Sequence, residues 1–421
     1  MALKRSRTAS KTKASRATKS HREDYPLQGT ALDLPMETVL GFSPSKRKQY
    51  IKSVVTEFAK KIKTDEMTLK RRTSFTVEMR DLRKILKSAP DAYLYTDEKN
   101  GKRWVLGKGS PGSTHVYWSR NQIWKMKTKG GYLQKQLLEL SPKLITTIDK
   151  LLDPRMESKK GFRNTKKSAI LNILSYLEMD KSSGCAFPPF HARFFADKYL
   201  PLDSGGIVVD PCAGWGGRLL GTLLVNRTSH VQYIGIDPEE RNRKAYEGLT
   251  RRATIWLKKE IAGTRESKIY YLPFEDWIAG SSAKKLFGQV DLVITSPPYF
   301  GAENYNPENP NQSANRYDEY LVWREKFYRK LMRGAFRLLN SGGHFVLNIA
   351  DVAEAPRLER DARKLAAEEG FVSDGFYKLA MSMSAATRKA GNARHATQVD
   401  GKLFKHEPVF VFKKPLSKVS E

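Results

Sequence analysis

Cysteine and long apolar runs are both scarce in this sequence. The only two cysteines among 421 residues are Cys185 and Cys212, too few for a disulfide framework or a cysteine-based zinc site. Two lone thiols are typical of a reducing compartment, so we expect an intracellular protein. No apolar run approaches the roughly 20 residues that a membrane-spanning helix needs. We therefore expect no membrane partner, and nothing in the sequence indicates a metal site or an obligatory protein partner.

Acidic residues are missing from the first 22 positions, which also contain almost no large apolar side chains. Such a segment buries too little surface to offset the entropy lost on ordering, so residues 1–25 are predicted to be a disordered basic tail. Three roles stay open for this tail. It can act as an arm that contacts DNA, as a localisation signal or as an acid-poor transit peptide.

The whole chain has a formal charge of +30, and that charge is uneven. Residues 1–185 contain 40 Lys and Arg against 18 Asp and Glu, whereas residues 186–421 contain 35 against 27. Because Lys and Arg neutralise phosphates and release counterions, this excess indicates a nucleic acid as partner. The alternative is a basic surface that serves only solubility. We expect the protein to reside with the DNA, in the nucleoid or nucleus.

Residues 26–185 are predicted to be a basic, mainly helical recognition region. Apolar residues recur at helical spacing after Ser45, a second helix is expected from Phe75 to Leu86, and further helices near 132–152 and 164–178. Between them, residues 102–129 alternate aromatic and basic side chains around a Gly/Ser/Pro turn, which indicates a hairpin. Its tryptophans either pack inward or face the partner. The candidate nucleic-acid contacts are Lys102, Arg103, Lys108, Arg120, Lys125 and Lys127.

From residue 186 to 415 the pattern changes to alternating strands and helices, followed by a short tail at 416–421. This alternation predicts an α/β catalytic domain, a doubly wound and mostly parallel sheet of seven strands. The expected strands are Ile207–Asp210, Tyr233–Asp237, Ile269–Leu272, Asp291–Thr295, His344–Ile349, Phe371–Leu379 and Pro408–Phe412. Ligands of such sheets bind at the carboxyl ends of the strands, near the point where strand order reverses.

A small-residue loop follows the first of these strands. It contains Asp210, Pro211, Ala213, Gly214 and Gly216 before a helix begins. Glycines allow a ligand close to the backbone, although an ordinary tight turn has the same composition. The next strand ends in Asp237, 23 residues after Gly214, and an acid about 20 residues beyond such a loop commonly binds ribose hydroxyls.

Acids also follow the third strand, at Glu275 and Asp276. Either carboxylate can accept a hydrogen bond from an adenine amino group, or can be a solvated loop acid. The loop that follows the first strand lacks the GxxxxGK[ST] phosphate clamp. The predicted ligand is therefore an adenosine cofactor without phosphates. S-adenosylmethionine has this chemistry, and its sulfonium charge suits nearby carboxylates.

The fourth strand leads into Ser296-Pro297-Pro298-Tyr299. Two consecutive prolines fix two φ angles and remove two backbone donors, so that carbonyl groups project without competing N–H groups. With an aromatic ring beside them, these carbonyls can receive an extruded base and its amino hydrogens. The alternative is a proline-stiffened turn after a core strand.

Thr295 to Tyr299 resembles the catalytic signature of the N4-cytosine and N6-adenine DNA methyltransferases. Residues 210–216 resemble their cofactor loop, Asp237 their ribose-binding acid, and the segment from Phe187 the part that packs beside the methionine end of the cofactor. The segments 317–323, 338–344 and 406–412 also look like this family, so the resemblance covers residues 187–414. Cys212 and Trp215 depart from the usual cofactor loop. Only about 80 residues separate the two motifs, so recognition is expected in the N-terminal half.

The resemblance implies direct methylation of an exocyclic amine on a flipped DNA base, with no covalent enzyme–base adduct. Ser296 and the Pro297 carbonyl would accept hydrogen bonds from the amine, and Tyr299 would stack on the base. Serine at the first motif position favours cytosine N4 over adenine N6. Two other functions stay open, namely methylation of guanine N2 in RNA and DNA binding by an inactive methyltransferase fold.

Overall fold

The computed structural model describes residues 27–63, 82–89, 91–107, 127–128, 131–132, 142–156, 168–173, 187–201, 204–225, 230–381, 396–399 and 401–416. The basic tail, most of the predicted hairpin and most of the predicted helix Phe75–Leu86 lie outside these residues. Within them, no helix is long and apolar enough to cross a membrane.

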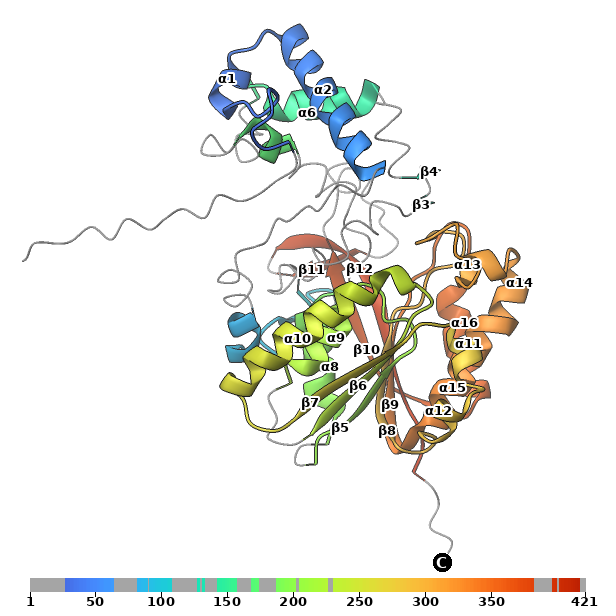
Figure 1. Ribbon diagram of the computed structural model, residues 1–421. Helices are drawn as coiled ribbons and strands as arrows, with labels where there is room; N and C mark the ends of the chain where they lie inside the picture. The colour runs from blue at the N-terminus through green and yellow to red at the C-terminus, as the bar shows by residue number, and fades with distance from the viewer. Residues whose placement is uncertain are drawn as a thin grey trace, which may run out of the picture.

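The centre of the molecule is one twisted sheet (Figure 1). Four parallel pairings connect β7 (Arg265–Tyr270), β6 (Val231–Ile236), β5 (Gly206–Asp210), β8 (Val290–Thr295) and β9 (Leu339–Asn348), in that spatial order. Strand β12 (Lys402–Lys413) then runs antiparallel between β9 and β10 (Val372–Met381), and β11 (Ala396–Val399) pairs with β12. Strand order reverses between β5 and β8. The predicted doubly wound, mostly parallel α/β fold is confirmed, and all seven predicted strands are present.

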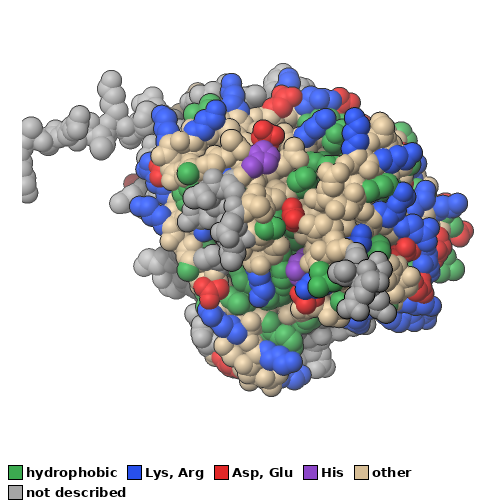
Figure 2. All heavy atoms as spheres, turned by 90° about the horizontal axis from the view of Figure 1, so that it is seen from below, with side chains coloured by type: hydrophobic (Ala, Val, Ile, Leu, Met, Phe, Trp, Pro, Cys, Tyr) green, Lys and Arg blue, Asp and Glu red, His purple; other side chains and the backbone are tan. Residues whose placement is uncertain are grey.

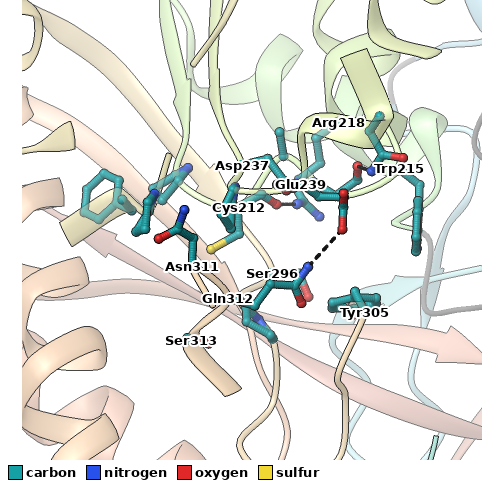
Figure 3. A pocket seen from close by; sticks show the side chains of 18 of the residues that line it. Cys212, Trp215, Arg218, Asp237, Glu239, Ser296, Tyr305, Asn311, Gln312 and Ser313 are labelled. Atoms are coloured by element: carbon teal, nitrogen blue, oxygen red, sulfur yellow. Dashed lines mark hydrogen bonds between the residues drawn. The ribbon is translucent and has the colours of Figure 1, made fainter. Parts of the chain in front are cut away.

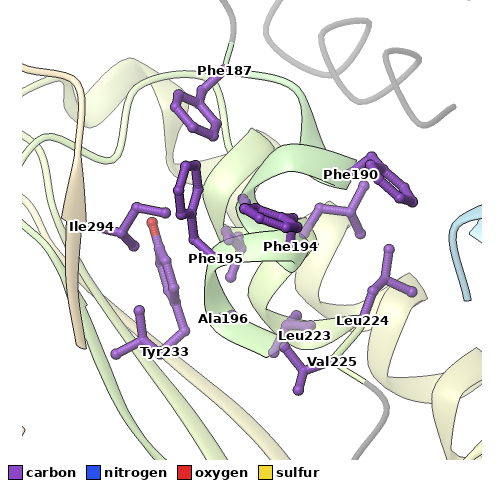
Figure 4. Packing of buried hydrophobic residues seen from close by; sticks show 14 of the residues in the cluster. Phe187, Phe190, Phe194, Phe195, Ala196, Leu223, Leu224, Val225, Tyr233 and Ile294 are labelled. Carbon is purple, nitrogen blue, oxygen red and sulfur yellow. The ribbon is translucent and has the colours of Figure 1, made fainter. Parts of the chain in front are cut away.

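Helices cover both faces of this sheet (Figure 1). One face carries α8 (Pro189–Tyr199), α9 (Gly217–Leu223) and α10 (Arg243–Glu260), whereas the other carries α11 (Phe274–Trp277), α12 (Ser281–Lys284), α15 (Arg329–Leu338) and α16 (Leu358–Glu368). Strand residues alternate between the two cores, because successive side chains of a strand point to opposite faces. Val208 and Tyr233 pack under α8 and α9, as Figure 4 shows for Tyr233, whereas Val209 and Ile234 pack on the other side.

Two short strands from the predicted recognition region extend this sheet. Strand β2 (Arg103–Leu106) pairs in parallel with β10, and β1 (Leu94–Thr96) pairs antiparallel with β2. Arg103–Leu106 was expected in a hairpin with the residues after it, but its antiparallel partner precedes it in the chain. The Lys378 ammonium fixes this edge by pairing at 2.6 Å with the buried Asp97 carboxylate, which also accepts a hydrogen bond from the Trp104 indole. The sheet thus crosses the predicted domain boundary at residue 185.

The N-terminal helices form a separate apolar cluster. It contains α1 (Met36–Leu40), α2 (Pro44–Lys63), α6 (Pro142–Leu152) and the helical residues 169–173, and the Arg47–Asp149 ion pair of 2.6 Å joins α2 to α6. A two-stranded ribbon of β3 (Lys127–Thr128) and β4 (Gly131–Tyr132) lies nearby. Trp215, from the loop after β5, is the only buried member of this cluster that comes from the described part of the catalytic half. The N-terminal helices therefore pack directly against the predicted cofactor loop.

Candidate cofactor and substrate site

A cleft lies at the carboxyl ends of the parallel strands, where strand order reverses. It is partly open to solvent and is lined by residues that follow β5, β6, β7 and β8. Predicted residues that line it are Phe187, Pro211, Ala213, Gly214, Asp237, Glu275, Ser296 and Pro298. Among the described residues, none from position 350 onward lines it. The topology of the sheet thus brings together side chains that are more than 100 positions apart in the chain.

The loop after β5 depends on two glycines with positive φ. Gly214 has φ +61° and Gly216 has φ +84°, a region that side chains with a Cβ rarely adopt. Gly216 does not line the cleft, and a Cβ there would lie 2.7 Å from Leu249. Gly214 lines the cleft, and its N–H donates to Asp237 at 2.7 Å. Gly216 therefore shapes the turn, while Gly214 is the glycine that a ligand meets.

Asp210 supports this loop from below the cleft. Its side chain is fully buried and accepts hydrogen bonds from Arg218 Nε at 2.7 Å and from the Tyr233 hydroxyl at 2.8 Å. Arg218 also donates to the carbonyl of Cys212, so the guanidinium closes the turn. Asp210 was predicted among the cofactor-binding residues, but it does not line the cleft. Its contacts position the loop instead.

Asp237 is the buried acid at the end of β6. Its carboxylate accepts the backbone N–H groups of Gly214 at 2.7 Å and of Glu239 at 2.8 Å. Burial raises the pKa of Asp237 to about 7, although these two hydrogen bonds lower it. Glu239, which sequence reasoning missed, also lines the cleft and pairs with Arg241 at 2.8 Å. Two carboxylates therefore face a ligand at this strand end.

The two acids after β7 have different environments. Glu275 is buried, lines the cleft and accepts a hydrogen bond from the Tyr317 hydroxyl at 2.9 Å; burial raises its pKa. Asp276 lies half exposed outside the cleft and pairs with Arg316 at 2.8 Å. Of the two predicted candidates, Glu275 is thus the one placed to meet a ligand.

The predicted catalytic loop, residues 296–299, follows β8. Ser296 and Pro298 line the cleft, whereas Pro297 and Tyr299 do not. Tyr299 is buried, with 7% of the residue exposed, and its hydroxyl donates to Glu407 of β12 at 3.1 Å. Burial and the nearby Glu303 carboxylate raise the pKa of Glu407. The Tyr299 hydroxyl is thus fixed by a hydrogen bond to a residue that is 108 positions away in the chain.

Other lining residues were not predicted. Trp215 and Tyr305 pack edge to face at 5.6 Å at one end of the cleft, and Asn311 and Ser313 lie toward the other end (Figure 3). The missed lining residues are Cys212, Trp215, Gly217, Arg218, Pro238, Glu239, Asn242, Pro273, Phe274, Tyr305, Asn311, Gln312, Ser313 and Phe327. The run of Asn, Gln and Ser at residues 311–313, which begins 12 positions after Tyr299, was a usable signal, because such a polar segment has no apolar face to bury.

The basic residues predicted to contact nucleic acid are described only in part. Lys102 lies over the Trp104 ring at 5.0 Å, and Arg103 is exposed and pairs with Asp91. Lys108, Arg120, Lys125 and the side chain of Lys127 lie outside the described residues. On the face shown in Figure 2, Lys and Arg side chains are mixed with acids. The catalytic half thus offers no single-sign surface on this face.

No protein-family model and no curated protein matches this chain. Similar solved structures include an S-adenosylmethionine-dependent methyltransferase from Methanosarcina mazei, at 14% identity over 53% of this chain and 98% of that one, with a TM-score of 0.31. An O-methyltransferase from Thermotoga maritima has 12% sequence identity over 56% of this chain and 70% of that one, with a TM-score of 0.32. A putative rRNA methylase from Clostridium thermocellum has 13% sequence identity over 54% of this chain and 98% of that one, with a TM-score of 0.32. These scores are low, so the fold assignment rests on the strand order.

Proposed function

We propose that this protein is an S-adenosylmethionine-dependent methyltransferase that acts on an exocyclic amino group of a DNA base. One observation carries the proposal. The same cleft is lined by Ser296 and Pro298 of the catalytic loop and by Asp237, the proposed ribose acid. A methyl donor and an acceptor amine bound there would lie within one cavity. Cytosine N4 is favoured over adenine N6.

The chemistry of the cleft fits this cofactor. Gly214 allows close approach, and the carboxylates of Asp237, Glu239 and Glu275 suit ribose hydroxyls and a sulfonium charge. Among the described residues that line the cleft there is no lysine and a single arginine, Arg218. This arginine is already paired with Asp210. A nucleotide with several phosphates would lack charge partners here. An adenosine ligand without phosphates is the better match.

In the proposed reaction, the bound cofactor supplies a methyl group on a positively charged sulfur. The Ser296 oxygen and the Pro297 carbonyl, although Pro297 does not line the cleft, would accept the two N–H groups of the amine and favour a pyramidal nitrogen. Its lone pair would attack the methyl carbon as the carbon–sulfur bond breaks, so that a neutral thioether leaves and the methylated amine releases one proton to solvent. Most of the rate enhancement would come from this positioning. Burial raises the pKa of the Cys212 thiol, so a thiolate adduct is not expected.

Tyr299 stays the proposed stacking partner for the base, although little of its ring is exposed. Two other aromatic side chains that line the cleft, Tyr305 and Trp215, can add to that contact. Because Trp215 packs into the N-terminal helical cluster, a base held here would lie beside the part of the chain with most of the positive charge. DNA bound by the N-terminal half would then present its base to the catalytic loop.

A methyl-transfer assay with labelled cofactor tests this proposal. The full chain is incubated with duplex DNA or with RNA, and the digested nucleosides are separated by chromatography. We expect label in N4-methylcytosine or N6-methyladenine from DNA. Label in N2-methylguanosine from RNA would favour the RNA enzyme, whereas DNA binding without any label would favour an inactive fold.

The pKa of Asp237 leads to a pH-dependent affinity. Ribose hydroxyls donate to the ionised carboxylate, so binding must favour the form that exists above a pKa of about 7. We expect affinity for 5′-methylthioadenosine, which carries no charge near neutrality, to rise between about pH 6 and pH 8. Asp237→Asn should remove this dependence and weaken binding about 10-fold to 100-fold, as loss of a charge-assisted hydrogen bond does. Calorimetry at three pH values measures both, and a flat wild-type profile would exclude Asp237 as the ribose acid.

The basic N-terminal half leads to a salt-dependent affinity for DNA. Removal of residues 1–22 should weaken binding to all duplexes alike and flatten the salt dependence, because phosphate contacts are lost. Charge reversal at Lys102, Arg103, Lys108, Arg120, Lys125 and Lys127 should cost more, and it can also change site preference. Binding is measured across a salt series. If fragment 187–421 folds and equals the full chain in affinity and salt slope, recognition lies elsewhere.

A further inference from the structure

The segment Glu303–Tyr317, here called the strap, follows the catalytic loop and crosses the end of β6. The Asn309 amide donates to the carbonyl of Pro238 at 2.8 Å. The Gln312 amide donates to Glu239 at 3.4 Å, the contact marked in Figure 3. The first half of the strap is therefore held by the loop that contains the proposed ribose acids.

The second half of the strap is held by the loop after β7. Arg316 pairs with Asp276 at 2.8 Å and with Glu275 at 3.2 Å, and the Tyr317 hydroxyl donates to Glu275 at 2.9 Å. Between these two anchors, residues 311–313 line the cleft. Ser313 thus lies between the strand end proposed to bind ribose and the strand end proposed to bind adenine.

Two polar atoms of the cleft wall lack hydrogen-bond partners. Ser313 Oγ and Asn242 Oδ1 are buried, in residues only 7% and 2% exposed, and neither has a partner within the described part of the chain. A buried polar group without a partner destabilises the fold, because it has lost its hydrogen bonds to water and gained none. Because both residues line the cleft, a ligand in the cleft can supply the missing partners.

We propose that Ser313 contacts the adenine of the cofactor and that the Asn242 amide oxygen accepts a hydrogen bond from its ribose. This inference rests on the proposed function. Pro273, Phe274 and Phe327 line the same cleft and offer apolar surface for a flat ring, while a hydroxyl can both donate to and accept from the polar adenine edge. The strap, which begins beside the catalytic loop, is then part of the cofactor site.

This contact connects the cofactor to the catalytic loop. The Glu303 carboxylate, at the start of the strap, accepts the Tyr305 hydroxyl at 2.6 Å and lies 3.4 Å from the Tyr299 backbone nitrogen. A ligand that fixes Ser313 therefore also restrains the segment that positions Tyr299. Cofactor binding should order the site that receives the base.

Affinities of three ligands for the full chain test the contact. S-adenosylmethionine, S-adenosylhomocysteine and 5′-methylthioadenosine all carry adenosine, but the third lacks the amino-acid end. Ser313→Ala should weaken all three about threefold to tenfold, the effect of one neutral hydrogen bond. Ser281 is an exposed residue of α12 and lies outside the cleft, so Ser281→Ala is the matched control and should bind like the wild type.

Three results would overturn this assignment, and each is distinct. If Ser313→Ala binds all three ligands like the wild type, Ser313 is no contact, although the proposed function stands. If it loses affinity only for the two ligands with an amino-acid end, Ser313 contacts that end and not adenine. If the wild type binds none of the three, both this inference and the proposed function fail.

Hydrogen exchange of the unmodified chain provides a second test that no folding defect can affect. With 5′-methylthioadenosine bound, amides of residues 303–317 should exchange more slowly, while those of α16, outside the cleft, should not change. Unchanged exchange in the strap, at a ligand concentration that saturates the wild type, would exclude it from the cofactor site.

Discussion

Replacing Arg218 with alanine should lower the free energy of unfolding by about 3–5 kcal/mol, because it leaves a buried carboxylate without its ionic partner. Asp210 has no exposed surface, and Arg218 is 4% exposed. The Tyr233 hydroxyl and the Cys212 backbone N–H also donate to Asp210, but these two neutral donors cannot compensate the charge. Urea unfolding of the full chain, followed by circular dichroism, measures the loss.

An exposed ion pair is the matched control for this prediction. Arg333 on α15 pairs with Glu369 at 3.1 Å but is more than half exposed, so Arg333→Ala should cost less than about 1 kcal/mol. The double variant Arg218→Met, Asp210→Leu removes both buried charges and should recover much of the lost stability. If Arg218→Ala costs no more than Arg333→Ala, the pair does not support the cofactor loop.

The sequence predicted the catalytic sheet well because its strands are short apolar runs between helices. Expected and observed bounds of β5 and β8 differ by a single residue at the start of each strand. Both strands are buried on two faces, so that most residues in them are apolar, and this pattern is local. The positions of the motifs followed from it, since parallel strands present their carboxyl ends at one edge.

The edge of the sheet could not be predicted in the same way. Strand β1 has three residues and β2 has four, too few for a period of two to stand out. Their place depends on pairing with β10 and on the Asp97–Lys378 contact, which joins positions 281 apart in the sequence. Local patterns hold no information about a pairing over that distance. The alternating aromatic and basic residues nearby indicated a hairpin instead.

The site shows the same limit at single residues. Asp237 and Ser296 could be predicted as lining residues because each directly follows a strand. The Asp210 side chain can point either toward a ligand or toward Arg218. Packing around the loop decides between the two, and the sequence motif does not encode that packing. Tyr299 was expected to present its ring, but Glu407 holds its hydroxyl from another strand. Motifs thus identified the loops, whereas tertiary contacts decide which side chain of each loop faces the cleft.

Substitutions in the catalytic loop should have the largest effect on methyl transfer. Ser296→Ala removes an acceptor for the amine, and a preorganised polar group at a reacting centre is worth about 100-fold to 1000-fold in rate. Tyr299→Ala should cost a similar factor, since it removes the ring together with the hydroxyl that donates to Glu407. Single-turnover transfer to duplex DNA at saturating S-adenosylmethionine measures the rate, and calorimetry should show nearly unchanged cofactor affinity.

Tyr299→Phe separates the two roles of this tyrosine. It keeps the ring and removes only the hydroxyl that donates to Glu407. If the ring stacks on the base, Tyr299→Phe should retain a rate within about tenfold of the wild type, since it loses one hydrogen bond. A loss as large as that of Tyr299→Ala would assign the effect to the Glu407 contact and not to stacking. Methyl transfer by Ser296→Ala at the wild-type rate would show that the amine binds elsewhere in the cleft.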